Sequence, residues 1–378
     1  MGSLSRFFPD TSDASEGAHD HNHLIYAIFC FKDASCNISN VIDCYDPSHN
    51  SWHRVTSIPG TSSPGDNLVL KNFAMVSIGH HIYIIGGRLC RKVVGSNDTD
   101  ICIVEEKNLM VLDCVRRYDT RTDSWETCQP MNSPRFDFAC TVCGDQIFVA
   151  GGQETLDQAR GISSAEMYDT SSDEWRFLAN MSTKRYKCVG ATWQGKIHVL
   201  GGFAEKGDGG DNIISGPFNT TRSSGEVYDP EHDSWEFLAR MWDLDIPPYQ
   251  IVAINGKLFS SGDCLIPWKG HVETYSETEK MWNVVHGSHY DNLSRNFTRD
   301  DHVAPMRRMY LTMAPIGNRL YFLTGYKVPG GESRLRNEVH VFDTAASDRS
   351  GWRSFEPVME EREKELCGHC CVLVKHVS

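Results

Sequence analysis

Long apolar runs are absent from this sequence, which argues against a membrane-spanning helix. No stretch approaches the ~20 consecutive apolar residues that such a helix needs. The N-terminal segment, MGSLSRFFPDTSDASEGAHDHNH, also lacks the apolar centre of a secretory signal peptide and is rich in acidic and polar residues. We therefore expect a protein that is kept in the cytosol or the nucleus and has no membrane partner.

Positive charge is scarce as well. The chain has 37 lysine and arginine residues against 50 aspartate and glutamate residues, so its formal net charge is −13. Proteins that bind a phosphate backbone usually carry a basic patch or stripe. This balance argues against nucleic acid and anionic lipid as partners.

The 14 cysteines do not form a disulfide framework. They are spread along the chain, and without a secretory signal we expect them to be reduced. Cys367-Gly368-His369-Cys370 matches a redox motif by letters, but on a strand its two thiols would point to opposite faces. No second pair of ligands has the spacing of a zinc site, so the sequence predicts no metal site and no cofactor.

What the sequence does contain is a repeat. An aromatic residue is followed by Trp seven positions later in five copies, with a sixth, looser copy at Phe342/Trp352. The five regular pairs are Tyr45/Trp52, Tyr118/Trp125, Tyr168/Trp175, Tyr228/Trp235 and Tyr275/Trp282. Apolar segments that end in small residues, such as IFVAGG at 147–152, precede the last five pairs. Alternating segments between Gly, Asp and Ser turns predict four antiparallel strands per repeat.

Each motif residue has a packing reason. A glycine at the end of a strand lets a neighbouring sheet approach where a Cβ atom would collide. The aromatic residues supply large apolar surfaces, ~150–250 Å² each, between sheets. We therefore expect structural roles for Gly86, Gly87, Gly151, Gly152, Gly201, Gly202, Trp52, Trp125, Trp175, Trp235, Trp282 and Trp352.

Paired glycines, then Tyr-Asp, then Trp resemble the kelch repeat, whose units form the blades of β-propellers. In overall style the chain is similar to the propeller half of plant F-box/kelch proteins. The resemblance implies an all-β, six-bladed propeller of four-stranded antiparallel blades in a single domain, 23–378, after a disordered segment, 1–22. The expected blades are 23–57 with 366–375, 70–130, 135–181, 185–241, 248–287 and 306–358. We expect the C-terminal strand to join the first blade and close the ring, which removes exposed sheet edges.

The large insertions are expected on one face of the propeller. They fall between the second and third strands of a repeat or between successive repeats, and strand alternation brings both kinds of connection to the same side. Insertions confined to one face of a repeat array usually mark the binding face. The insertions are 56–70, 88–114, 203–224, 286–305 and 326–337.

The first strand of each repeat should line the central channel, so the residues at its entrance should ring the channel mouth. Aligned copies give an outer set and a second set two residues further in. The outer set is Arg135, Arg185 and Arg308, with Lys71 and Glu363; the inner set is Asn72, Asp137, Lys187, Tyr310 and Glu365, with Tyr249 or Gln250.

Two interpretations of the arginines stay open. In kelch propellers that bind peptide degrons, arginines near these positions hold acidic groups, so the resemblance implies a protein or acidic peptide ligand held through bidentate hydrogen bonds. Alternatively, the arginines lie at blade junctions and pair with neighbouring acids or strand-end carbonyls.

Kelch proteins often deliver substrates to ubiquitin ligases through an F-box or BTB domain. Only some 23 residues precede the first expected strand, which is too few for either domain. An adaptor role would therefore need a separate scaffold, and membership of a ligase complex is a hypothesis.

The alternative function is a channel-mouth enzyme, or a binder of a small molecule or metal, because propellers host both binding and catalysis. Nitrile-specifier proteins, also kelch propellers, carry an iron motif whose nearest match is Glu361-xxx-Glu365-xxx-His369, with Glu in place of the central Asp. We expect the run 360–365 to be a solvated charge run instead. Histidines at 286, 289 and 302 lie among acidic residues, but without a nucleophile or a fixed ligand set we predict no catalytic residue.

Overall fold

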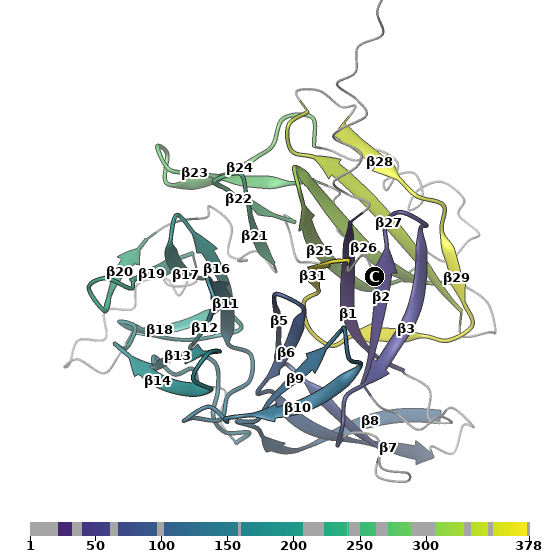
Figure 1. Ribbon diagram of the computed structural model, residues 1–378, viewed down its shortest axis with the longest axis horizontal. Helices are drawn as coiled ribbons and strands as arrows, with labels where there is room; N and C mark the ends of the chain where they lie inside the picture. The colour runs from purple at the N-terminus through teal and green to yellow at the C-terminus, as the bar shows by residue number, and fades with distance from the viewer. Residues whose placement is uncertain are drawn as a thin grey trace, which may run out of the picture.

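The computed structural model describes residues 22–31, 40–60, 67–96, 102–157, 160–206, 223–239, 241, 250–261, 271–288, 307–328, 334–346 and 351–375 (Figure 1). The predicted disordered segment lies outside these residues apart from Asn22. The secondary-structure elements of the described residues are all β-strands, as predicted. None of the described residues forms a helix with the length and hydropathy needed to cross a membrane.

The third repeat shows how the sequence builds one sheet. β11 (Ala139–Cys143), β12 (Gln146–Ala150), β13 (Ala165–Asp169) and β14 (Glu174–Leu178) form an antiparallel meander. The spacing of seven places Tyr168 directly opposite Trp175 on the neighbouring strand. Between them, Asp173 adopts a positive φ of 56° in the turn and accepts a hydrogen bond from the Tyr168 hydroxyl at 2.5 Å. The motif therefore fixes both the turn and the register of this hairpin.

The same arrangement recurs along the chain. In all six copies the aromatic residue and its Trp lie with ring centroids 5.0–5.7 Å apart. Three further four-stranded sheets are β5 (Ala74–Ile78), β6 (His81–Ile85), β9 (Val115–Asp119) and β10 (Ser124–Cys128); β16 (Val189–Trp193), β17 (Lys196–Leu200), β19 (Gly225–Asp229) and β20 (Ser234–Leu238); and β21 (Ile251–Ile254), β22 (Lys257–Ser260), β23 (Glu273–Ser276) and β24 (Met281–Val284). Each is consistent with a propeller blade.

Two sheets have five strands. The first combines β25 (Arg307–Ile316), β26 (Arg319–Lys327), β27 (Leu335–Asp343), β28 (Trp352–Ser354) and β29 (Val358–Glu360). The second combines β1 (His23–Phe31), β2 (Val41–Asp46) and β3 (Ser51–Ser57) with the C-terminal β30 (Lys364–Leu366) and β31 (Cys371–Val374). β30 and β31 both pair with β1, so the two ends of the chain share one sheet (Figure 1). The cysteines whose side chains are described carry free thiols.

The first strands of the sheets pack against one another. β11 contacts β5 on one side and β16 on the other, β21 contacts β16 and β25, and β31 contacts both β25 and β5. Apolar clusters fill the space between successive sheets; one includes Phe148, Tyr228 and Met181. Packing between sheets therefore supplies the core, as the repeat motif indicates.

Gly190 lies where β16 approaches the backbone of β11 closely. A Cβ atom at this position would lie 2.7 Å from the carbonyl oxygen of Cys140, which is backbone and has no freedom to move aside. We expect Gly190→Ala to lower the free energy of unfolding by about 1–3 kcal/mol through overpacking. Denaturant unfolding measures this change, and an unchanged midpoint would contradict the close approach of the two strands.

Candidate functional site

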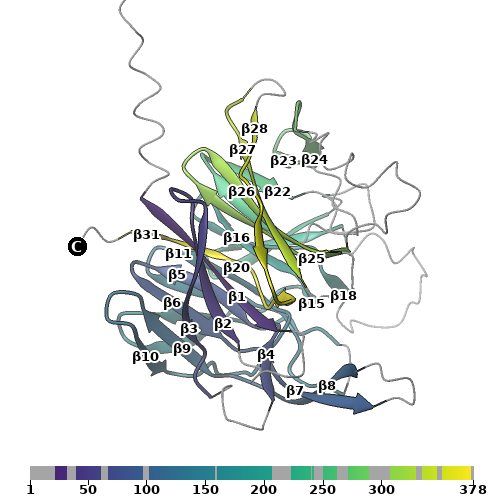
Figure 2. The same ribbon diagram turned by 90° about the vertical axis from the view of Figure 1, so that its right-hand side faces the viewer.

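The predicted insertions build extra β-structure on one side of the molecule. Part of the insertion at 88–114 forms a long hairpin, β7 (Arg88–Ser96) and β8 (Cys102–Val111), which pairs with β4 (Leu68–Lys71). The insertion at 203–224 begins with β18 (Phe203–Lys206), which pairs with β15 (Thr183–Tyr186). Both extensions lie on the right-hand side of Figure 2. We call this side the loop-rich face.

Arg135 lies at the start of the third repeat, but its side chain does not reach the surface. The guanidinium is 0% exposed and forms an ion pair with Glu166, which is equally buried. It also donates to the carbonyl oxygens of Gly151, at 3.0 Å, and Ser164, at 3.2 Å. These partners belong to the alternative interpretation, in which the arginine pairs with an acid and strand-end carbonyls.

Arg185 repeats this arrangement in the fourth repeat. Its side chain is also 0% exposed, with Nε 3.3 Å from an oxygen of Glu226. It donates to the carbonyl oxygens of Gly201 and Ser224 at 3.2 and 3.1 Å. The predicted role of Arg135 and Arg185 as ligand-binding residues does not fit this burial: both guanidinium groups are enclosed by protein and paired with a buried glutamate and with backbone carbonyls.

The acidic partners explain why this pair recurs. Glu166 and Glu226 each stand two residues before the repeat tyrosine. Glu226 also accepts the backbone N–H groups of Ser182, at 2.6 Å, and Thr183, at 3.1 Å, and thereby holds the connection that enters the repeat. The first sheet has an equivalent pair, in which buried Lys364 donates to Asp43 at 2.9 Å. An acid two residues before the tyrosine is the sequence signal that could have revealed this pair.

Two other predicted residues do not form part of an open mouth. Tyr310 is buried, and its hydroxyl donates to Asn337 Oδ1 at 2.5 Å. Burial raises the pKa of Tyr310 well above its ordinary value, so the phenol stays neutral. Gln250 is also buried and bonds to the backbone of Met313. Of the three predicted arginines, Arg308 is half-buried on β25, opposite Tyr326.

Asn72, Asp137 and Lys187 lie together at the entrances of the first strands of their repeats. Each has a positive φ, of 55°, 55° and 54°. The N–H of Asp137 donates to the carbonyl oxygen of Asn72 at 3.1 Å, and the N–H of Lys187 donates to that of Asp137 at 2.6 Å. Three successive repeats are thus joined in one line of backbone hydrogen bonds at the entrance of their first strands.

The side chains along this line carry both signs of charge. Asn72 donates to Asp137 Oδ1 at 2.5 Å and accepts from Arg88 Nε at 2.9 Å, while the Lys187 side chain is exposed. Burial raises the pKa of Asp137, although Lys187, Asn72 and Arg88 oppose this shift. We call Asn72, Arg88, Asp137 and Lys187 the mouth cluster.

A second charged network adjoins the mouth cluster through Lys71. Lys71 pairs with Glu365 on β30, and its Nζ lies 3.0 Å from Glu106 on β8. Buried Lys92 donates to the carbonyl oxygen of Phe31 at 2.8 Å. Burial by itself raises the pKa of Glu365, but Lys71, with the Cys30 thiol and Lys92, outweighs burial and lowers it to about 2. Glu365 is therefore ionised and tied to the hairpin.

Apolar side chains stand beside these charges. On the β7–β8 hairpin, Val93, Leu109 and Met110 are 45%, 37% and 51% exposed. On β18, Phe203 stacks against Tyr186 with ring centroids 4.9 Å apart, and the Nζ of Lys187 lies 5.9 Å from the Phe203 ring centroid. Exposed apolar groups with a charged rim are typical of protein-binding surfaces.

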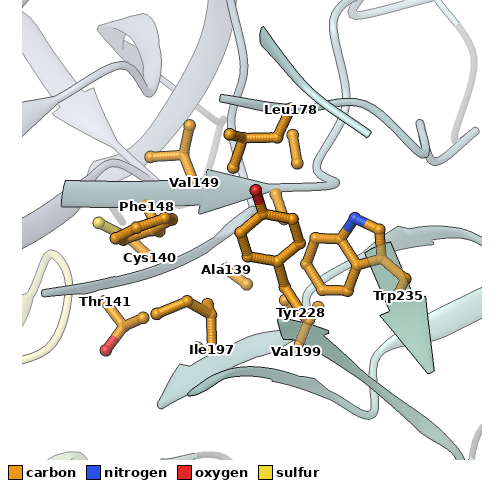
Figure 3. Close-up of a pocket in the computed structure, with 13 residues that line it drawn as sticks. Ala139, Cys140, Thr141, Phe148, Val149, Leu178, Ile197, Val199, Tyr228 and Trp235 are labelled. Carbon is orange, nitrogen blue, oxygen red and sulfur yellow. The ribbon is translucent and has the colours of Figure 1, made fainter. Parts of the chain in front are cut away.

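The cavity in Figure 3 lies between the third and fourth sheets and has a different character. Its walls are mainly apolar, with Phe148, Tyr228 and Trp235 among the lining side chains. The Tyr228 hydroxyl donates to Asp233 at 2.9 Å, and the indole N–H of Trp235 donates to the carbonyl oxygen of Ala179 at 2.7 Å. With these groups engaged, the cavity is a packing space at a sheet junction.

The residues considered for an iron site or for acid–base chemistry do not converge in the described part of the chain. Glu361 is exposed, Glu365 pairs with Lys71, and burial lowers the pKa of His369 to about 4. The predicted solvated charge run at 360–365 is wrong in part, because Lys364 is fully buried against Asp43. His286 is exposed. His289, His302 and Tyr249 lie outside the described residues, as do Asp291, Asp300 and Asp301.

Comparisons with known proteins agree with this architecture. A model described as the Kelch motif matches residues 134–182 and 184–241. The F-box/kelch-repeat protein At1g16250 of Arabidopsis thaliana is 30% identical over 295 residues, which are 76% of this chain and 67% of that protein. The F-box/kelch-repeat protein At1g67480 of the same plant is 24% identical over 247 residues, 65% of this chain and 54% of that protein. Kelch-like protein 36 of Mus musculus is 25% identical over 197 residues, 51% of this chain and 26% of that protein. The chain thus spans between about half and two thirds of the length of these plant relatives.

Proposed function

Since this chain belongs to the kelch-repeat proteins and is related over its repeat region to plant F-box/kelch proteins, we propose that it binds a protein or peptide partner at its loop-rich face. The kelch domain is generally a protein-binding module. The observation that carries the proposal is the exposed apolar surface of the β7–β8 hairpin beside the mouth cluster. We assign no catalytic residue and no cofactor.

We further propose that the repeats form a closed, six-bladed ring in a single domain with the blade ranges predicted above. The pairing of β30 and β31 with β1 supports closure. So does the order of contacts among the innermost strands, which runs from β5 through β11, β16, β21 and β25 to β31 and back to β5. Closure gives the loop-rich face a rigid base and makes it one continuous rim around a channel.

The charges of the mouth cluster indicate the chemistry of the partner. Lys71 is neutralised by Glu106 and Glu365, and the two fully buried arginines do not contribute. Arg88 and exposed Lys187 are cations of the mouth cluster that lie beside apolar surface. We therefore propose a segment that places an acidic group against Arg88 and Lys187 and apolar side chains against Met110 and Phe203.

The test compares capture of partners from native extract by the wild-type protein and by Met110→Glu/Lys187→Glu. We expect the double variant to lose a partner that the wild type holds, because it places negative charge in the apolar centre and reverses the charge of the rim. Phe237→Glu is the matched control: Phe237 is 45% exposed on β20, the outermost strand of its sheet. Equal thermal stability of the three proteins excludes unfolding as the cause.

Unchanged capture by Met110→Glu/Lys187→Glu, or equal loss with Phe237→Glu, would overturn the proposed face. The same samples test a role in ubiquitin ligation. We propose that the bound set includes a cullin or Skp1-like scaffold in the cytosol or nucleus, and capture of a partner without such a subunit would remove this part of the proposal.

A further inference from the structure

A cluster of two histidines and one aspartate lies at the other end of the second sheet from the loop-rich face. β6 begins at His81 and ends where the chain enters β7, so its two ends lie on opposite sides of the molecule. His80 occupies the turn between β5 and β6, and His81 pairs directly with Asp119 at the end of β9. The N–H and hydroxyl of Thr120 both donate to the carbonyl oxygen of His80, at 3.1 and 2.8 Å, which ties the two turns together.

The three side chains converge on one point. The Nε2 atoms of His80 and His81 each lie 3.6 Å from Oδ2 of Asp119. All three ligand atoms lie within 4.8 Å of one another, and the imidazole centroids are 4.0 Å apart. Ligands bound about 2.0–2.2 Å from a tetrahedral metal ion are separated from one another by about 3.3–3.6 Å. The two distances to Asp119 therefore match the edges of a tetrahedral site.

The carboxylate is already oriented for this role. Oδ1 of Asp119 accepts the backbone N–H groups of Arg121, at 2.8 Å, and Thr122, at 3.3 Å. Oδ2 is thereby directed at the two imidazoles. Fixing of a ligand by hydrogen bonds behind it is typical of metal sites, where such bonds hold the geometry in advance of binding.

The fold does not require histidine at these positions. An aspartate follows the tyrosine in the neighbouring repeats as well, and it binds the backbone of its turn in the same way. In the third sheet, Gln146 pairs with the equivalent aspartate, Asp169. In the fourth sheet, the Nζ of Lys196 lies 3.1 Å from Asp229. A neutral amide or an ammonium group thus fills the place of His81 elsewhere.

We propose that His80, His81 and Asp119 form a binding site for a divalent transition-metal ion, Zn²⁺ by ligand type, with a fourth position open to water. Two imidazole nitrogens and one carboxylate oxygen suit zinc, whereas magnesium and calcium prefer oxygen ligands alone. The site is separate from the proposed protein-binding face. It departs from the sequence-based expectation of no metal site, because spacing along the chain does not show that the β5–β6 turn meets the end of β9.

The test is titration of the EDTA-treated full-length protein with ZnCl₂ by calorimetry, alongside His81→Gln and His80→Asn. Since glutamine occupies the equivalent position in the third sheet, His81→Gln is compatible with the fold, and thermal melting without metal verifies this for both variants. We expect the wild type to bind one Zn²⁺ that raises its melting temperature, and each variant to bind at least about tenfold more weakly. His232→Gln, in the exposed Asp229, Glu231 and His232 group, is the control and should bind like the wild type.

Cobalt substitution distinguishes metal binding at this site from metal binding by the free cysteines. The wild type loaded with Co²⁺ should show ligand-field bands without the charge-transfer absorption of a thiolate ligand, and His81→Gln should lose those bands. Equal zinc affinity in wild type and His81→Gln, or a thiolate band in the cobalt spectrum, would overturn the proposal. If His81→Gln melts differently without metal, the comparison rests on His80→Asn and the cobalt spectrum of the wild type.

Discussion

Replacing Arg185 with methionine should lower the free energy of unfolding by about 3–5 kcal/mol, because removal of one partner strands a buried charge. Glu226 would remain 0% exposed without its guanidinium, and the carbonyl oxygens of Gly201 and Ser224 would each lose a donor. Methionine preserves much of the side-chain volume, so a cavity contributes little to the loss. Equilibrium denaturant unfolding measures the effect.

The control for this prediction is an ion pair on the surface. Arg117 pairs with Glu126 on neighbouring strands, and their side chains are 28% and 58% exposed. Arg117→Met should cost at most about 1 kcal/mol, since solvent screens exposed pairs. If Arg185→Met were as stable as Arg117→Met, the buried pair would not stabilise the junction. A loss of binding in Arg185 variants is therefore evidence about recognition only when stability is shown to be unchanged.

Deletion of residues 366–378 should abolish cooperative unfolding and leave a protein that aggregates or is readily proteolysed. The deletion removes β31 and the end of β30, and with them buried Cys367, Cys371 and Leu373. Burial of the Leu373 side chain contributes about 1.5–3 kcal/mol, the two smaller cysteine side chains add to this, and the deletion also exposes the paired edge of β1. Together with the lost strand pairing, these losses are a large fraction of the ~5–15 kcal/mol that stabilises a typical domain.

Removal of residues 376–378 alone is the matched control. It leaves Lys375, whose N–H donates to the carbonyl oxygen of Asn22 at 2.6 Å and whose Nζ lies 2.7 Å from Asp46. This shorter truncation should melt and migrate like the full chain. The closed ring would be contradicted if the protein without residues 366–378 stayed monomeric and melted cooperatively at the melting temperature of the full chain.

The sheets could be predicted from sequence because their determinants are local. The Tyr–Trp spacing reports a hairpin whose register follows from its turn, as Tyr168 and Trp175 show. The pairing of the C-terminal strand with β1 could be expected from an incomplete first repeat. The interruption of that strand, in which residues 367–370 separate β30 from β31, could not be predicted because the repeat motif contains no signal for it.

The candidate site could be predicted only in part. Asn72, Asp137 and Lys187 could be grouped from the sequence because their backbone positions are equivalent in three repeats. Arg135 and Arg185 were expected to bind a ligand because alignment of the repeats gives the backbone position of a residue but not the direction of its side chain. The buried acids two residues before Tyr168 and Tyr228, Glu166 and Glu226, decide that direction.

The hairpin that carries exposed Val93, Leu109 and Met110 could not be predicted as strands. Its sequence lies in an insertion, 88–114, which has no counterpart in the other repeats. β7 pairs with both β4 and β8 in a three-stranded sheet of its own, which no repeat motif predicts. The positions of the insertions predicted that extra structure lies on one side of the molecule, while the nature of that surface required the structure.

Binding of a protein partner at the loop-rich face can be observed by hydrogen–deuterium exchange of the protein with and without the partner that it captures. We expect slower exchange on binding in β7, β8, β15 and β18, with the outer strands β14 and β20 unchanged. Protection confined to the outer strands, with the loop-rich face unchanged, would contradict it.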